Sequence, residues 1–228
     1  MKKYKLLLLS ATLLFSSYLF SQKQEKLFYE QNFSAFAEYF CNEYGIICKE
    51  PQNFSDLNKY NMGWAVRDNP DKSCAFLFGP IYKSNDGECL LAYPVKNLFS
   101  NLEIMIVNEI KSALGLYNRF GHFNDTTRIE FYDYVSVVIG KKAREMFNAD
   151  SIYLYDIPGG DSVVFLWNEE LETMRKEKYP YCTGLVICKE GKFGTPMKLF
   201  FSEKGKMRED EYIEVLSKKI WYDDNCNK

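Results

Sequence analysis

Residues 181–221 read YCTGLVICKEGKFGTPMKLFFSEKGKMREDEYIEVLSKKIW, and this stretch decides the fold. Cys182–Glu190 is a short run with apolar side chains on both faces, which predicts a buried strand ending in a glycine-containing turn. After Pro196 the chain alternates, with Met197, Leu199 and Phe201 on one side and Lys198 and Ser202 on the other. This alternation predicts a half-buried strand that returns beside the first.

A helix is predicted to follow this hairpin. Gly205 opens a segment in which the apolar residues Ile213, Leu216 and Ile220 recur at helical spacing. Such a helix can lie on the apolar face of the hairpin, so that the two together close a core.

Helical spacing also marks earlier segments. An aromatic stripe from Phe33 to Tyr44 predicts a helix that stops at Gly45. Ser100–Glu103 has the pattern of a capping box, with Ser100 as the cap of a helix that runs to about Gly115. This cap and the long helical period outweigh the strand propensity of the Ile104–Val107 run. Shorter helices are predicted at Lys141–Phe147 and Glu169–Lys178.

Turn signals at residues 68–71, 85–87 and 158–161 separate short strand-like runs. The predicted strands are Met62–Val66, Cys74–Phe78, Glu88–Tyr93, Ser151–Ile157 and Ser162–Trp167. Because strands and helices come in blocks with short links, the sequence favours an α+β fold over a parallel α/β fold. We expect a largely antiparallel sheet of about six or seven short strands, with three or four helices packed on it.

The N-terminus has the layout of a secretory signal peptide. Lys2, Lys3 and Lys5 precede an uncharged run, Leu6–Phe20, and Ser21 offers a small residue for cleavage. The segment resembles bacterial export signals. An uncleaved anchor is the alternative, but the run is shorter than the ~20 apolar residues of a spanning helix and contains several hydroxyl residues. We therefore expect residues 1–21 to be a signal peptide and residues 22–228 to form a single α+β domain in the periplasm or outside the cell.

Charge and aromatic content narrow the function classes. Without residues 1–21 the chain has 26 basic and 31 acidic residues, a net charge of −5. This balance argues against a nucleic-acid-binding protein, which needs a concentrated basic face. Aromatic residues make up 17% of the chain. They suit an aromatic core or, alternatively, a surface that binds sugars or a partner protein.

The seven cysteines all follow the signal peptide, and export makes disulfides possible. Cys182 and Cys188 lie on one predicted strand at a separation of about 20 Å, too far apart for a bond. Cys41 and Cys48 flank a predicted helix end and could pair. An odd number leaves at least one thiol free or paired between molecules.

Motifs for common chemistries are absent from the sequence. It has no GxxxxGK[ST], GxGxxG, GxSxG or CxxC pattern, and its one histidine rules out HExxH zinc sites. We therefore expect no cofactor.

Weak catalytic candidates remain. His122 is the one side chain that titrates near neutral pH, and it could serve a Cys–His pair. Paired acids for glycoside cleavage could be drawn from Asp133, Asp156, Asp161 and Glu169. Asp68, Asp71 and Asp86 could ligate calcium, but their spacing lacks the EF-hand pattern and turn chemistry explains them better.

The leading hypothesis is an exported, non-enzymatic binding or interaction protein of the bacterial cell envelope. Its partner would be another envelope protein or an extracellular ligand, with neither nucleic acid nor a membrane span after cleavage. The alternative is a secreted hydrolase that uses a Cys–His pair or scattered carboxylates. An envelope-maintenance protein without a small ligand is a third possibility, and the sequence leaves the oligomeric state open.

Overall fold

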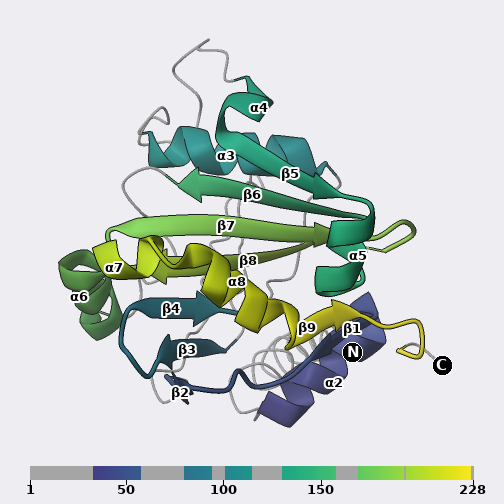
Figure 1. Ribbon diagram of the computed structural model, residues 1–228, viewed down its shortest axis with the longest axis horizontal. Helices are drawn as coiled ribbons and strands as arrows, with labels where there is room; N and C mark the ends of the chain where they lie inside the picture. The colour runs from purple at the N-terminus through teal and green to yellow at the C-terminus, as the bar shows by residue number, and fades with distance from the viewer. Residues whose placement is uncertain are drawn as a thin grey trace, which may run out of the picture.

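The computed structural model describes residues 33–57, 80–93, 101–114, 130–157, 169–192 and 194–226. Seven of its strands form one antiparallel sheet (Figure 1). In their order across the sheet they are β2 (Phe54–Asp56), β3 (Ile81–Ser84), β4 (Cys89–Ala92), β8 (Thr195–Phe201), β7 (Tyr181–Cys188), β6 (Ser151–Ile157) and β5 (Val135–Ile139). A second, two-stranded sheet pairs β1 (Ile46–Cys48) with β9 (Ile220–Tyr222).

Seven helices accompany the sheets within the described residues. They are α2 (Phe33–Tyr44), α3 (Leu102–Ala113), α4 (Phe131–Tyr134), α5 (Lys141–Phe147), α6 (Glu169–Lys178), α7 (Glu203–Lys206) and α8 (Glu209–Ser217). The predicted α+β class with a large antiparallel sheet is confirmed, with more helices than the three or four expected. None of the described helices is long and apolar enough to cross a bilayer.

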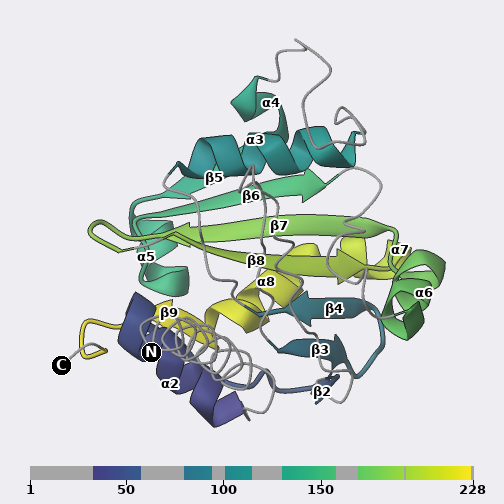
Figure 2. The same cartoon turned by 180° about the vertical axis from the view of Figure 1, so that it is seen from behind.

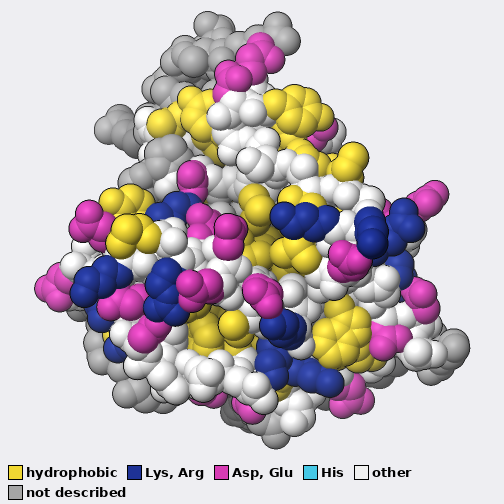
Figure 3. All heavy atoms as spheres, viewed as in Figure 1, with side chains coloured by type: hydrophobic (Ala, Val, Ile, Leu, Met, Phe, Trp, Pro, Cys, Tyr) yellow, Lys and Arg dark blue, Asp and Glu magenta, His cyan; other side chains and the backbone are white. Residues whose placement is uncertain are grey.

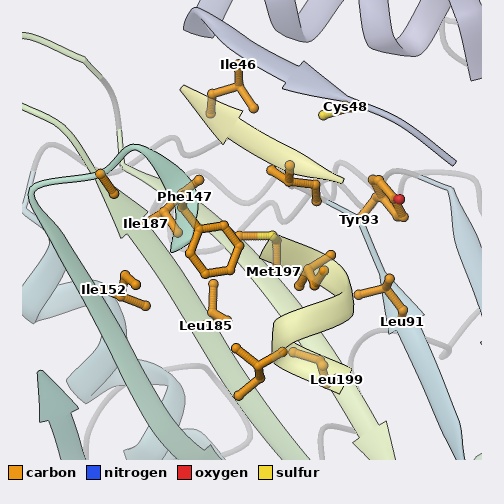
Figure 4. Close-up of a cluster of buried hydrophobic side chains, with 14 of the residues drawn as sticks. Ile46, Cys48, Leu91, Tyr93, Phe147, Ile152, Leu185, Ile187, Met197 and Leu199 are labelled. Carbon is orange, nitrogen blue, oxygen red and sulfur yellow. The ribbon is translucent and has the colours of Figure 1, made fainter. Parts of the chain in front are cut away.

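One face of the large sheet, the front face, is closed by helices and by the small sheet. In Figure 1, α5, α8 and β9 lie in front of the strands, and α2 lies beside β1. Figure 4 shows Leu185, Met197 and Leu199 of the central strands directed toward Phe147 and its apolar neighbours in this core. The predicted packing of a C-terminal helix on the hairpin is confirmed, because Ile213 and Leu216 of α8 belong to the same buried cluster.

A disulfide bond fastens the end of the chain to this front layer. Cys41 of α2 is bonded to Cys226, with a Cα–Cα distance of 5.0 Å. The pairing of Cys41 with Cys48 that the sequence allowed is wrong. Cys48 is the last residue of β1, beyond the end of α2, and it is buried in the core as a free thiol. Gly45 ends α2 as predicted, with a φ of 67° that suits glycine.

The opposite, back face carries a second core under α3. Figure 2 shows α3 in front of the sheet on the side of β5 and β6. Met105, Ile106 and Ile110 of α3 are buried against Tyr155, Val186 and Phe200 of the strands. The Tyr155 ring packs directly over Gly184 of β7, where there is no room for a side chain, because a Cβ on Gly184 would lie 2.2 Å from that ring.

The strand predicted after Pro196 is confirmed as β8, which returns beside β7, but its half-buried character is wrong, because every residue of β8 is buried. The strand lies in the middle of the sheet, so that both of its faces are covered. Lys198, predicted to face solvent, is 2% exposed and points into the back core, where it meets Glu109 of α3.

Two helix boundaries differ from the prediction. Ile220 belongs to β9 and not to the C-terminal helix, because α8 ends at Ser217 and the chain turns to pair with β1. Asn101 supplies the cap of α3, since its Oδ1 accepts a hydrogen bond of 3.1 Å from the Ile104 amide. Ser100, predicted to be the cap, lies outside the described residues, and the choice of helix for 104–107 is confirmed.

The strand predictions were confirmed in part. The strands predicted at 88–93, 151–157 and 182–190 are confirmed as β4, β6 and β7. Five short strands, β1, β2, β3, β5 and β9, were not predicted, and β3 supplies the partner of β4 across the turn at residues 85–87. The strands predicted at 62–66, 74–78 and 162–167 lie outside the described residues.

Candidate functional site

The two named catalytic candidates, His122 and Asp161, lie outside the described residues, as do Asp68 and Asp71. Glu169 is the first residue of α6, and Asp133 is exposed in α4. These positions therefore assemble no site within the part of the chain that the structure describes.

Asp156, another carboxylate candidate, is engaged by a lysine. Lys206 of α7 lies 2.5 Å from Asp156 Oδ1 and 2.6 Å from Glu209 Oε2, and its ammonium group also donates to Thr183. The arrangement is an ion-pair cluster that joins α7 to the large sheet.

Asp86 occupies the centre of the best-formed polar site. Its Oδ1 accepts hydrogen bonds from the Ser84 hydroxyl at 2.6 Å and from the Glu88 amide at 3.1 Å. Its Oδ2 accepts from the Tyr212 hydroxyl at 2.8 Å and from Arg208 at 3.0 Å. The carboxylate thus ties the β3–β4 turn to the start of α8.

These contacts set the ionisation of Asp86. Partial burial opposes the charged form, but the hydrogen bonds from Ser84, the Glu88 amide, Tyr212 and Arg208 outweigh it and lower the pKa of Asp86 from 3.8 to about 2. Because both oxygens already accept hydrogen bonds, the carboxylate stabilises the turn and is not arranged to bind a calcium ion. No cluster of three or more metal-ligating side chains occurs among the described residues.

A shallow pocket of about 330 Å³ opens beside Asp86, and we call it the Asp86 pocket. The residues that line it come from the start of β2 and the connection before it, from the end of β3 and the turn after it, and from α8 and its N-cap: Gln52, Asn53, Phe54, Ser84, Asn85, Asp86, Arg208, Glu211, Tyr212 and Val215. This lining combines polar side chains with aromatic rings. Figure 3 shows acidic and basic side chains interleaved over the neighbouring α6 and α7 end of the molecule.

The pocket is held rigidly by its own residues. The rings of Phe54 and Tyr212 meet edge to face at 6.3 Å. Arg208 lies over the Tyr212 ring at 5.4 Å and forms a 2.9 Å ion pair with Glu211. Asn53 has a φ of 62°, a left-handed conformation that asparagine tolerates, and its carbonyl accepts from the Asn85 amide. Pre-organised polar groups of this kind lower the cost of ordering when a ligand binds.

A buried polar cluster lies under α3 on the back face. Lys198 Nζ lies 2.7 Å from Glu109 Oε1, with the two side chains 3% and 7% exposed. The Tyr155 hydroxyl donates to the other Glu109 oxygen. Tyr155, Gly184 and Lys198 are successive partners across β6, β7 and β8, which places the tyrosine and the lysine beside one another under the helix.

The free thiols lack the features of a nucleophile. Burial raises the pKa of Cys48 and of Cys89 well above the ordinary range, and raises that of Cys188 to about 11. A catalytic cysteine needs a lowered pKa in an accessible, electropositive setting. These three thiols fit the packing role of small hydrophobic residues.

The edge strand β5 is a second surface feature. Tyr132, Tyr134 and Ile139 are exposed by 75%, 39% and 69%, and they lie within eight consecutive residues. Figure 3 shows hydrophobic side chains gathered at this end of the molecule, over α4 and β5. Among the described strands, β5 pairs with β6 alone.

No protein-family model, no curated protein and no solved structure matches this chain.

Sequence reasoning singled out Asp86 but missed its partners. Arg208 and Tyr212 lie more than 120 residues further along the chain, as their contacts with Asp86 show. No local pattern marks such a contact, because tertiary packing alone brings the turn and the helix together.

Proposed function

We propose that the protein is an exported, non-catalytic binding protein of the bacterial cell envelope, which holds a neutral, hydroxyl-rich ligand of the saccharide class in the Asp86 pocket. The observation that carries the proposal is a hollow held in place by its own contacts, in which amide and charged side chains lie beside the half-buried ring of Phe54.

The chemistry of the lining selects this ligand class. Hydroxyl groups both donate and accept hydrogen bonds, and the side chains of Gln52, Asn53 and Asn85 can do both. The half-buried ring of Phe54 offers apolar surface to the C–H face of a sugar, while Tyr212, 6% exposed, supports that ring from the core. Two carboxylates and one guanidinium line the pocket, which disfavours an anionic ligand.

Export is supported by two independent features. Lysines at the start of the chain precede the uncharged Leu6–Phe20 run, as in a signal peptide. The Cys41–Cys226 disulfide suits an oxidising compartment such as the periplasm or the cell exterior. Mass spectrometry of the protein from its host should find an N-terminus near Gln22, and an intact Met1 on cytosolic protein would contradict export.

Ligand binding can be tested by titration of neutral mono- and disaccharides, followed by NMR shifts of the Asn and Gln side-chain amides. We expect Asn85→Ala to weaken binding about three- to tenfold, the effect of one or two lost hydrogen bonds. Glu145→Ala, on the exposed side of α5, is the matched control and should leave affinity unchanged. Saturating saccharide that shifts no resonance of the pocket would overturn the proposal.

A further inference from the structure

The β5 edge lacks the features that normally keep a sheet edge from pairing. Natural edge strands are short, or carry lysine, proline or a bulge. β2, at the other end of the sheet, is three residues long and ends in Asp56. β5 is five residues long, reads Val-Ser-Val-Val-Ile, and contains neither a charge nor a proline.

Its backbone has one strand partner in the described part of the chain, which is β6. The other side of an edge strand presents N–H and C=O groups to its surroundings. Apolar side chains are exposed at both ends of the strand, with Tyr132 of α4 at 75% and Ile139 at 69%, and Val137 and Val138 between them are half-buried. An added strand would therefore find hydrogen-bonding groups and apolar surface together.

Charges at the two ends of β5 define which strand fits. The residues just before the strand include the exposed acid Asp133, and the residues just after it include the exposed bases Lys141 and Lys142. When two copies of this strand pair antiparallel, the acidic end of each lies beside the basic end of the other. Parallel pairing would place like charges together, which is unfavourable.

We propose that β5 pairs antiparallel with the β5 of a second copy of this chain, about a two-fold axis, so that two seven-stranded sheets become one continuous sheet. Two-fold contacts of this kind use the same surface on both subunits, and they are the most common form of homo-oligomer. The inference goes beyond the ligand proposal and does not depend on it.

The expected dimer is weak and has a consequence for binding. A contact through one short strand falls at the low end of interface sizes, so we expect dissociation at micromolar concentrations. The Asp86 pocket lies at the end of the sheet formed by β2 and β3, far in strand order from β5. A dimer would carry two such pockets and could bind a repeating polymer with avidity.

Analytical ultracentrifugation of the protein from its host, with the disulfide intact, measures the dimer directly. We expect a monomer–dimer equilibrium that Val137→Lys shifts to monomer, while Val137→Thr, uncharged and suited to a strand, leaves it within about threefold. Circular dichroism of each variant establishes that it is folded. A wild type that stays monomeric at millimolar concentration would overturn the proposal.

A charge exchange tests the antiparallel arrangement through exposed residues, which spares folding. Asp133→Lys should weaken dimerisation at least fivefold, because two basic ends then meet. The triple variant Asp133→Lys, Lys141→Asp, Lys142→Asp should restore it, because each end again faces its opposite. An unchanged dissociation constant in Asp133→Lys would show that the contact lies elsewhere. A triple variant that dimerises no better than Asp133→Lys would show that the strands do not pair antiparallel.

Discussion

The two faces of the large sheet are closed by different means. The front face is covered by apolar side chains from α2, α5 and α8 and is secured by the Cys41–Cys226 disulfide. The back face is also apolar, but at its centre Glu109 of α3 binds Lys198 and Tyr155 of the sheet. The front is held by many interchangeable contacts, whereas the position of α3 depends on a few polar atoms that must all be satisfied.

The largest expected effect lies in the back core. Glu109→Ala should lower the free energy of unfolding by roughly 3–5 kcal/mol, because it leaves a buried ammonium group without its carboxylate. Urea denaturation measures this loss. The double replacement of Glu109→Leu and Lys198→Met, made in a Tyr155→Phe background so that no buried hydroxyl loses its acceptor, should recover most of it, since apolar residues of similar size need no counter-charge.

If the double replacement is as unstable as Glu109→Ala alone, the loss comes from packing, and the buried charge pair does not set the back face apart from the front. Lys198→Met alone should destabilise the protein too, because Glu109 would then be buried without its cation.

Front-face leucines should have the next largest effect. Leu199 and Leu216 are 1% and 0% exposed, so each change to alanine should cost roughly 2–5 kcal/mol through lost burial and a cavity. Thermal or urea unfolding measures both. A loss below about 0.5 kcal/mol at both sites would show that the front core is not built around these side chains.

The disulfide offers a third comparison. Cys41→Ser with Cys226→Ser should cost roughly 2–4 kcal/mol, because the bond spans 185 residues and restricts the unfolded chain. Reduction of the wild type should reproduce the loss, while the buried single thiol Cys48, changed to alanine, is the control for general loss of a cysteine. Equal stability of the oxidised and reduced protein would show that the disulfide does not stabilise the front face.

The local sequence pattern was sufficient to predict most of the buried residues of the front face, but it did not predict the polar contacts of the back face. The aromatic stripe of α2 and the stripe of α8 repeat at helical spacing, so their buried sides could be read from the sequence. Lys198 looks like the polar member of an alternating strand, and only the covering of β8 on both sides reveals it as buried. Its partner Glu109 is one charged residue on an apolar helix, with no local sign of its role.

The same limit applies to the Asp86 pocket and to the helix cap. The turn at residues 85–87 was predicted from its own residues, but the contact of Arg208 with Asp86 depends on the folding of the whole sheet. At α3 two adjacent residues, Ser100 and Asn101, both suit a cap, so the pattern located the helix start without identifying the residue.

The cap of α3 gives a smaller test on the back face. Asn101→Ala should lose about 1 kcal/mol, because the Ile104 amide is left without its acceptor. Asn101→Asp preserves an acceptor and should lose much less. Equal losses in both variants, measured by urea unfolding, would show that the side-chain oxygen does not cap the helix.

The smallest expected effect is a pH dependence at Asp86, outside both cores. Its folded pKa of about 2 lies below the ordinary 3.8, so the ionised carboxylate stabilises the fold above pH ~4 and this contribution disappears as the pH falls toward 2. The side chain is 39% exposed and solvent screens it, so we expect less than about 1 kcal/mol at neutral pH. Asp86→Asn should therefore be less stable than wild type at pH 7 and equally stable near pH 2.

Tyr212→Phe is the matched control for this pH dependence, because it removes one of the hydrogen bonds that favour the ionised carboxylate and leaves the ring in place. Its stability should fall less steeply than that of wild type between pH 4 and pH 2, while Asp86→Asn shows the least change in that interval. Urea unfolding at pH 7, 4, 3 and 2 measures all three proteins. A gap between wild type and Asp86→Asn that stays constant down to pH 2 would mean that the hydrogen bonds hold the turn by geometry alone, and that the charge of Asp86 contributes nothing to the stability of the pocket.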